Sequence, residues 1–318
     1  MTLISLVVAV ATMVGYLAIV WWLDRYDREP IGLLLANFLW GALGAILLSL
    51  ASGLVVQQGV EKVFHGILPE KLSGAIITAP IVEEPTKGVF FFFTAINRRF
   101  DNITDGAVYG AAIGLGFGMT ENFFYYLSAA SMNEWAALVV IRTLFSAVMH
   151  CMSTATLGAF VGLAKFRPIG QKLALVPSGL LIAMFIHFAW NVSVSFAATA
   201  VFGLIFVLLG VILTFGLFQL SLSLENRMIR RELSEEVENG LIPAEHLEYL
   251  PFASRRKRSG WCPSHVDRRK YIQLATELAF RKDQSRRCPS KNRDSYLAEV
   301  ESLRGRLSPV LHPPVPSE

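Results

Sequence analysis

Long apolar runs dominate this chain from its amino terminus to residue 224. Runs of about 18 or more apolar residues are typical of transmembrane helices, because about 20 helical residues cross the hydrocarbon core of a bilayer. Seven such runs predict membrane-spanning helices at 3–23, 32–57, 72–96, 106–128, 135–164, 173–198 and 201–224. The pattern therefore predicts an all-α fold, a polytopic membrane bundle of about seven helices.

The chain changes character after Leu224. Residues 1–224 hold 11 basic and 11 acidic side chains, whereas residues 225–318 hold 18 and 14. We therefore expect a transmembrane domain at 1–224 and a basic tail at 225–318. The tail pattern predicts helices at 225–239, 267–284 and 292–304, and residues 307–318, with four prolines, are expected to be disordered.

Composition narrows the class further. Only 17% of the residues are charged, against about 25% in soluble domains. The three cysteines, Cys151, Cys262 and Cys288, have neither a disulfide pattern nor zinc-site spacing. The basic cluster 255–258 has two readings, contact with anionic lipid headgroups or a solvated loop. No interleaving of aromatic and basic residues indicates nucleic acid, so no nucleic-acid partner is expected.

The distribution of Lys and Arg in the loops predicts the orientation. The loops at 24–30, 97–104 and 165–172 are basic, as is the tail, and the loops on the other side carry fewer basic residues. Because basic loops stay in the cytoplasm, we expect the amino terminus outside and the tail in the cytoplasm. The protein is thus predicted to be a multi-pass protein of the plasma membrane.

Ionisable residues interrupt the apolar runs. Such residues are costly within a bilayer and point to function unless they are paired. The third run carries Glu83, Glu84, Pro85 and Lys87, and the other candidates are Glu121 and Tyr125 in the fourth run, His150 and Thr154 in the fifth, and His187 and Asn191 in the sixth. At about 1.5 Å rise per residue, Glu83, Glu121, His150 and His187 fall near one central-to-outer depth.

These residue types suit peptide-bond hydrolysis. A carboxylate can activate water and pass the proton to a leaving amine, and an Asn amide can donate to an oxyanion. Histidines can hold the water or bind a metal. Lys87 can pair with Glu83 one turn away, which would leave Glu84 as the base. Simpler readings are a buried ion pair for the carboxylates and lysine, and a structural role for each histidine. Arg142 is read as pairing with Glu134 or reaching the outer surface, not as catalytic.

The same residues resemble a known family. Glu83-Glu84-Pro85-Thr86-Lys87 matches the EExxK pattern of the PrsW intramembrane proteases, and Glu121-Asn-Phe-Phe-Tyr125 matches their ExxxY element. His150 and the pair His187 and Asn191 are similar to the two remaining elements, which the CAAX prenyl endopeptidases also share. Thr120 stands where the family usually has phenylalanine. The resemblance covers about residues 70–195 and leaves the tail outside.

The resemblance implies proteolysis of a membrane protein substrate, such as site-1 cleavage of an anti-sigma factor. It assigns catalysis to Glu83, Glu84, His150, His187 and Asn191, with support from Lys87, Glu121 and Tyr125. The cofactor stays open: zinc held by Glu84, His150 and His187, or no metal at all. Two other classes of function use the same charges, an ion- or proton-coupled transporter and a non-catalytic membrane scaffold.

Overall fold

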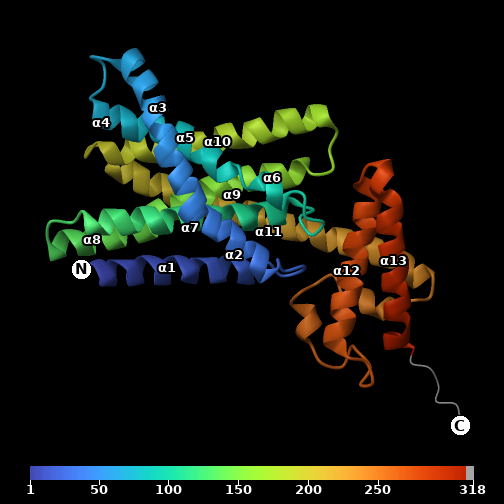
Figure 1. Cartoon of the computed structure of the whole chain (residues 1–318). Coiled ribbons are helices and arrows are strands. Elements are labelled where there is room, and N and C mark those ends of the chain that lie inside the picture. The colour runs from blue at the N-terminus through green and yellow to red at the C-terminus, as the bar shows by residue number, and fades with distance from the viewer. Residues whose placement is uncertain (313–318) are drawn as a thin grey trace, which may run out of the picture. The chain divides into compact units, whose positions relative to one another are not determined.

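The computed structural model describes residues 1–312, apart from the side chain of Lys291, and within that range it contains helices and loops but no strand (Figure 1). The predicted all-α class is confirmed. The chain divides into two compact units. Unit one comprises Met1–Asp24 and Glu29–Phe218, and unit two comprises Arg25–Arg28 and the chain from Gln219 onward.

Unit one is built from long helices that π-helical turns interrupt in three places. Its elements are α1 (Thr2–Leu23), α2 (Ile31–Leu39), η1 (Trp40–Ala45), α3 (Ile46–Phe64), α4 (Glu70–Ser73), η2 (Gly74–Thr78), α5 (Ala79–Gly88), α6 (Phe91–Thr94), α7 (Ile103–Leu127), α8 (Met132–Ile141), η3 (Arg142–Ser146), α9 (Ala147–Ala164), α10 (Ile169–Ser195) and the first part of α11 (Ala200–Glu238). Here η1, η2 and η3 are the π-helical turns, and each continues directly from the α-helix before it.

Each predicted span coincides with a helical segment, but only five segments in the described chain are long and apolar enough to cross a membrane. These are Thr2–Leu23, Ile31–Phe64, Met132–Ala164, Ile169–Ser195 and Ala200–Glu238. The two that fall short are the broken segment α4–α6 and the glycine-rich helix α7. These two segments carry the carboxylates at which the sequence places the chemistry.

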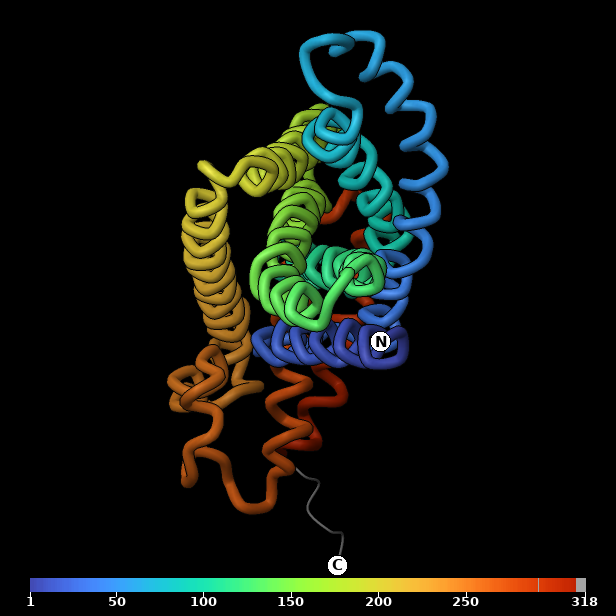
Figure 2. The backbone as a smooth tube through the Cα atoms, turned by 90° about the vertical axis from the view of Figure 1, so that its left-hand side faces the viewer, coloured from blue at the N-terminus to red at the C-terminus, as the bar shows by residue number. Residues whose placement is uncertain are grey.

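Helix α7 lies at the centre of unit one and packs most extensively against α9 (Figure 2). Glycines make this close approach possible. A Cβ atom built on Gly110 would lie 2.3 Å from the carbonyl oxygen of Thr154, and one on Gly114 would lie 2.2 Å from that of His150. Since no side chain fits there, the glycine stripe sets the spacing between α7 and α9 and thereby the position of His150.

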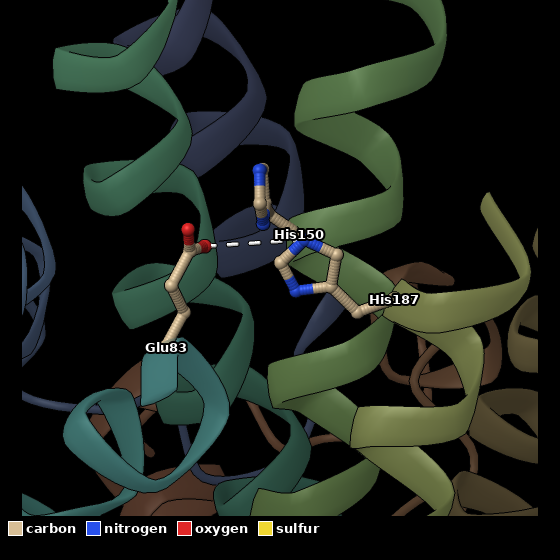
Figure 3. Close-up of side chains that lie close together, drawn as sticks. All are labelled: Glu83, His150 and His187. Atoms are coloured by element: carbon tan, nitrogen blue, oxygen red, sulfur yellow. Dashed lines mark ion pairs between the residues drawn. The ribbon is translucent and has the colours of Figure 1, made fainter. Parts of the chain in front are cut away.

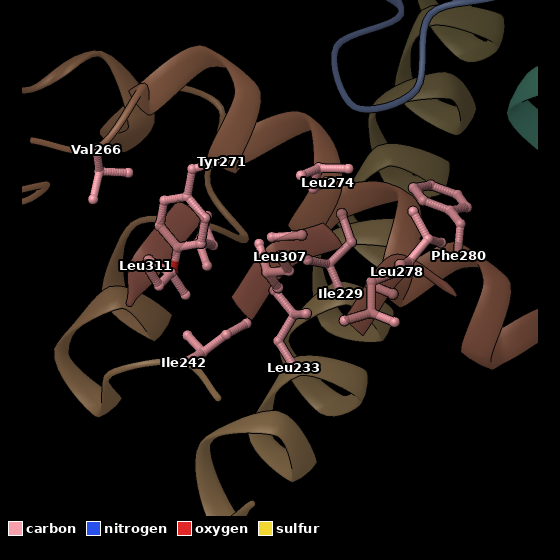
Figure 4. Close-up of a cluster of buried hydrophobic side chains, with 14 of the residues drawn as sticks. Ile229, Leu233, Ile242, Val266, Tyr271, Leu274, Leu278, Phe280, Leu307 and Leu311 are labelled. Atoms are coloured by element: carbon pink, nitrogen blue, oxygen red, sulfur yellow. The ribbon is translucent and has the colours of Figure 1, made fainter. Parts of the chain in front are cut away.

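Unit two has a hydrophobic core of its own, formed by the end of α11, α12 (Arg268–Arg287) and α13 (Ser290–Leu311) (Figure 4). Short 3₁₀ turns, η4 (Ala244–Glu248) and η5 (Arg255–Lys257), lie in the connection before α12. The core residues labelled in Figure 4 are Ile229, Leu233, Ile242, Val266, Tyr271, Leu274, Leu278, Phe280, Leu307 and Leu311.

Two expectations for the tail need correction. Residues 307–311 were expected to be disordered, but they form the last turn of α13, because Leu307 and Leu311 are buried in the core of unit two. Residues 313–318 lie outside the described part of the chain. The basic cluster 255–258 is not wholly exposed either, since Arg256 is buried and donates hydrogen bonds to the carbonyl of Leu250 and the hydroxyl of Thr276.

Candidate active site

Helix α5 carries three charged side chains on a short segment that contains a proline. Pro85 lies inside the helix and has no N–H to donate to the carbonyl of Ile81. Neighbouring elements hold the helix end: Trp40 Nε1 donates to the carbonyl of Thr86 at 3.1 Å, and the Thr86 hydroxyl lies 2.6 Å from the Ser49 hydroxyl. The helix ends at Gly88. Side chains of η1 and α3 therefore fix the charged turn close to the end of the helix.

Glu84 and Lys87 form the buried centre of this segment. Both side chains have no exposed surface, and Lys87 Nζ lies 2.7 Å from Glu84 Oε1. The same ammonium lies 4.1 Å from the centre of the Phe117 ring. The sequence led us to expect the lysine on Glu83, but that contact is longer, at 3.7 Å. Lys87 therefore neutralises Glu84 first, and Glu84 is the held carboxylate.

Glu83 is the carboxylate that can still accept a hydrogen bond. Its side chain is 17% exposed, and within the described chain its Oε2 atom is buried without a hydrogen-bond partner. Unsatisfied buried oxygens are rare and need an explanation such as catalysis or an absent water or ion. Glu83 is thus able to accept a proton or a ligand, the role that a pairing of Lys87 with Glu83 would have left to Glu84.

His150 on α9 is held from both sides. Its Nδ1 atom lies 3.0 Å from Lys87 Nζ, and its Nε2 atom lies 2.6 Å from Glu121 Oε2. Because an ammonium can only donate, Nδ1 accepts and Nε2 carries the hydrogen that Glu121 accepts. The ring is 1% exposed, so its orientation is fixed by α5 and α7 together.

His187 on α10 connects the two adjacent carboxylates. Its Nδ1 atom lies 2.9 Å from Glu84 Oε1, and its Nε2 atom lies 3.9 Å from Glu83 Oε2. An ionised carboxylate only accepts, so Nδ1 carries the hydrogen and the Nε2 lone pair faces Glu83. Figure 3 shows Glu83, His150 and His187 converging from three separate helices. The rings of His150 and His187 stand nearly perpendicular, with centroids 5.0 Å apart.

A cavity of about 760 Å³ reaches two carboxylates of this network. Glu83 and Glu121 line it, together with residues of α3, η2 and α7. Most of the lining is apolar, and Gln57 and Thr78, which are hydrogen-bonded to each other, add polar groups to the wall. Glu83 and Glu121 are thus accessible from this cavity.

The other candidates have structural contacts. Asn191 donates from Nδ2 to the carbonyl of Ala75 at 2.7 Å and so ties η2 to α10. Tyr125 lies under the guanidinium of Arg142, 3.6 Å from Arg142 Cζ to the ring centre. Thr154 donates to Glu84 Oε2 at 3.5 Å. The structure therefore gathers Glu83, Glu84, Lys87, Glu121, His150 and His187 in one network, with Asn191 and Tyr125 holding its surroundings.

Sequence reasoning missed Arg142. It was expected to pair with Glu134 or to reach the outer surface, but it is buried and lies 2.7 Å from Glu121 Oε2. Glu134 instead accepts from the backbone N–H of Ala130 at the start of α8. The signal that could have found Arg142 is its position in the same apolar run as His150, because a buried arginine needs a carboxylate partner.

A metal ion fits this site by its donor set. Glu83, His150 and His187 each offer one ligand atom, and these atoms lie within 4.8 Å of one another. Glu83 Oε2, which accepts no hydrogen bond within the described chain, and the Nε2 lone pair of His187 are available, and His150 would exchange one of its two hydrogen bonds. One carboxylate and two histidines suit zinc. This set contains Glu83, whereas the set expected from the sequence named Glu84, which Lys87 and His187 already occupy.

Comparison with known proteins decides the family. A family model described as "PrsW family intramembrane metalloprotease" matches residues 29–217. The chain belongs to the PrsW family. Protease PrsW of Geobacillus kaustophilus (strain HTA426) is 28% identical over 179 residues, which cover 56% of this chain and 74% of the relative. That of Clostridioides difficile (strain 630) is 31% identical over 144 residues, which cover 45% and 58%. No solved structure matches the chain significantly.

PrsW membership confirms the resemblance that the motifs indicated. The chain is a membrane-embedded protease, and the described helices give it the apolar segments of a multi-pass membrane protein. The match ends at residue 217, and the main part of unit two begins at Gln219. The carboxylates and histidines gathered in unit one all lie within the matched range.

Proposed function

We propose that Glu83 is the general base of this PrsW protease and that Glu84 is its structural partner. The observation that carries the proposal is the contrast between the two neighbours. Glu84 is fully buried against Lys87 and His187, whereas Glu83 lines the cavity with one oxygen that accepts no hydrogen bond from the described residues. Of these two neighbours, Glu83 is the one that can accept a proton from a water molecule in the cavity without first losing a hydrogen bond.

The roles of the other groups follow from their contacts. A water molecule between Glu83 Oε2 and His187 Nε2 would be oriented by both, and Glu83 would return the proton to the leaving amine. Glu84 fixes the His187 ring through Nδ1, and Glu121 fixes the His150 ring through Nε2. Lys87 supplies positive charge beside the place where an oxyanion would develop. Asn191 acts by holding η2, not by direct contact with the oxyanion.

When the metal ion that the family description implies is bound, Glu83, His150 and His187 would be its ligands, and Glu83 Oε2 would contact the ion in place of the water molecule. Bound there, zinc would polarise the scissile carbonyl and lower the pKa of a bound water. Glu84 and Glu121 would then serve as the carboxylates that orient metal-binding histidines, an arrangement that fixes the ring and raises its basicity. The same side chains keep their orienting roles whichever species occupies the site.

The proposed substrate is a membrane protein cut near the outer side of the bilayer. The predicted orientation, with the amino terminus outside and the tail in the cytoplasm, and the central-to-outer depth of the carboxylates support this choice. A membrane-spanning anti-sigma factor is the substrate that the family resemblance suggests. The apolar cavity wall suits the boundary of a transmembrane segment.

The test uses a pooled library of single-span reporters with randomised outer juxtamembrane segments, reconstituted with the full chain in liposomes. Cleavage products are identified by amino-terminal sequencing. We expect cuts near the outer end of the span by the wild type and none by Glu83→Gln. Glu238→Gln, an exposed carboxylate in α11, is the matched control. Equal cleavage by wild type and Glu83→Gln would refute the assignment.

A further inference from the structure

Arg142 contacts the site from outside the motifs that identify the family. Its Nη2 atom lies 2.7 Å from Glu121 Oε2, and its Nε donates to Asn122 Oδ1 at 2.9 Å. Its guanidinium also stacks on the Tyr125 ring. Arg142 thereby engages three residues within two turns of α7, and only 10% of its side chain is exposed.

One oxygen atom joins this arginine to the candidate active site. Glu121 Oε2 forms an ion pair with Arg142 Nη2, at 2.7 Å, and a hydrogen bond with His150 Nε2, at 2.6 Å. Glu121 itself lines the cavity and is 24% exposed. Without a second anchor, its carboxylate would be free to turn into the cavity and leave the histidine. The Arg142 guanidinium is the cation that keeps the Glu121 carboxylate against α9.

We propose that Arg142 is a positioning residue that holds Glu121 so that Glu121 can fix the His150 ring. This inference rests on the proposed function of the site, since it concerns the geometry of one of its histidines. Arg142 does not line the cavity, so it acts through Glu121 and not on the substrate. Orienting partners of this kind typically contribute about 10- to 100-fold to activity or metal affinity.

The local backbone explains how one helical segment provides both Arg142 and His150 as partners of Glu121. In a regular α-helix, Arg142 and His150 would lie about 80° apart around the axis, because eight residues at 3.6 per turn overshoot two turns. The π-helical turn η3, Arg142–Ser146, lies between them. Its wider turn takes up more residues per turn, which reduces the offset and turns both side chains toward Glu121.

The chemistry of arginine is also needed. Its planar fork reaches Glu121 with Nη2 and Asn122 with Nε, two partners that are adjacent on α7. A lysine keeps the charge but offers a single nitrogen, so it cannot hold both partners in one plane. Arg142→Lys therefore tests the geometry of the arginine while it keeps the positive charge. It also leaves a cation beside Glu121, so it can be measured even if Arg142→Met does not fold.

The experiment compares kcat and KM for the best-cut reporter of the liposome library. Arg142→Lys and Arg142→Met should each lower kcat about 10- to 100-fold, with KM and the thermal midpoint of Arg142→Lys close to wild type. In a Glu121→Gln background, Arg142→Lys should cause no further loss. Arg99→Met, the removal of an exposed cation, is the control. Wild-type kcat in Arg142→Lys, or losses that add to those of Glu121→Gln, would overturn the proposal.

A readout without proteolysis separates this inference from the proposed function. Mass spectrometry measures exchange of the C2 hydrogen of each histidine ring in the full chain. The buried His150 ring should exchange faster in Arg142→Lys, whereas His246 in unit two should be unchanged. Unchanged His150 exchange contradicts the positioning role. Retained cleavage by Glu83→Gln contradicts the proposed function instead.

Discussion

Lys87 and Glu84 form an ion pair of 2.7 Å between two side chains that have no exposed surface. Water solvates neither charge, so each depends on the other. Both groups also contact a histidine: Lys87 lies beside His150, and Glu84 lies beside His187. The pair therefore links the stability of unit one to the geometry of its candidate active site.

Breaking this pair should be strongly destabilising. Lys87→Met leaves the Glu84 charge buried and uncompensated, and loss of one partner of a buried pair costs about 3–5 kcal/mol. The double variant Lys87→Met/Glu84→Gln has no unpaired charge and should recover a large part of that loss. Denaturant titration in detergent micelles measures both values. A double variant as unstable as the single one would contradict the pairing.

The approach of α7 to α9 predicts a sharp effect of one methyl group. Gly114→Ala places a Cβ atom 2.2 Å from the His150 carbonyl oxygen, so the helices must separate. We expect loss of proteolysis and a lower thermal midpoint. Gly15→Ala in α1 is the matched control, because nothing lies within 4 Å of its added Cβ. It should be neutral or slightly stabilising, since alanine favours helix over glycine.

The sequence predicted where the helices are, and it singled out the polar side chains that the structure brings together inside unit one. Apolar runs report helices directly, and charges within such runs are too costly to be incidental. It did not predict which of two adjacent carboxylates faces the cavity. Glu83 and Glu84 differ by about 100° around the helix, and the choice depends on the lysine and histidine that reach Glu84 from other turns and helices.

Arg142 escaped prediction for a related reason. Regular helical geometry separates it from His150, and only the π-helical turn η3 brings them to the same carboxylate. The helices of unit two were predicted, but its core was not, because that core is assembled from short apolar pieces, such as Ile242 and Leu307, that lie far apart in a polar sequence. The periodicity of apolar residues predicts neither the contact of Arg142 with Glu121 nor the contacts in the core of unit two.

Unit two should lose stability in acid through His246. This ring is buried beside Trp261, and its Nδ1 atom lies 2.9 Å from the Tyr271 hydroxyl. Burial lowers the pKa of His246 below its ordinary value of about 6.5. Folding therefore favours the neutral ring. Its stabilising contribution is complete above pH 6.5 and is lost as the pH falls toward the lower folded-state pKa.

Hydrogen exchange of the α12 amides in the full chain measures this effect. Exchange at pH 5.5, corrected for its intrinsic pH dependence, should show weaker protection than at pH 7.5 in the wild type. His246→Gln has no titrating ring and should show a smaller difference. Equal pH dependence in both proteins would exclude His246 as the group responsible.

Metal affinity should depend on Glu83, which accepts no hydrogen bond at Oε2, and not on Glu84, which Lys87 and His187 already contact. Glu83→Gln removes a proposed ligand and should abolish zinc binding by the purified chain, whereas Glu238→Gln should bind as wild type. Calorimetric titration with zinc measures the affinity. Undiminished binding by Glu83→Gln would place the metal elsewhere.

We propose that Glu83 performs the chemistry while Glu84 holds the site together. Single-turnover cleavage of the best-cut liposome reporter by wild type and Glu83→Gln tests this division of roles, with folding of each confirmed by its thermal midpoint. Glu83→Gln should fold like the wild type and bind the reporter but not cut it. Cleavage by folded Glu83→Gln at the wild-type rate would contradict the assignment of Glu83 as the base.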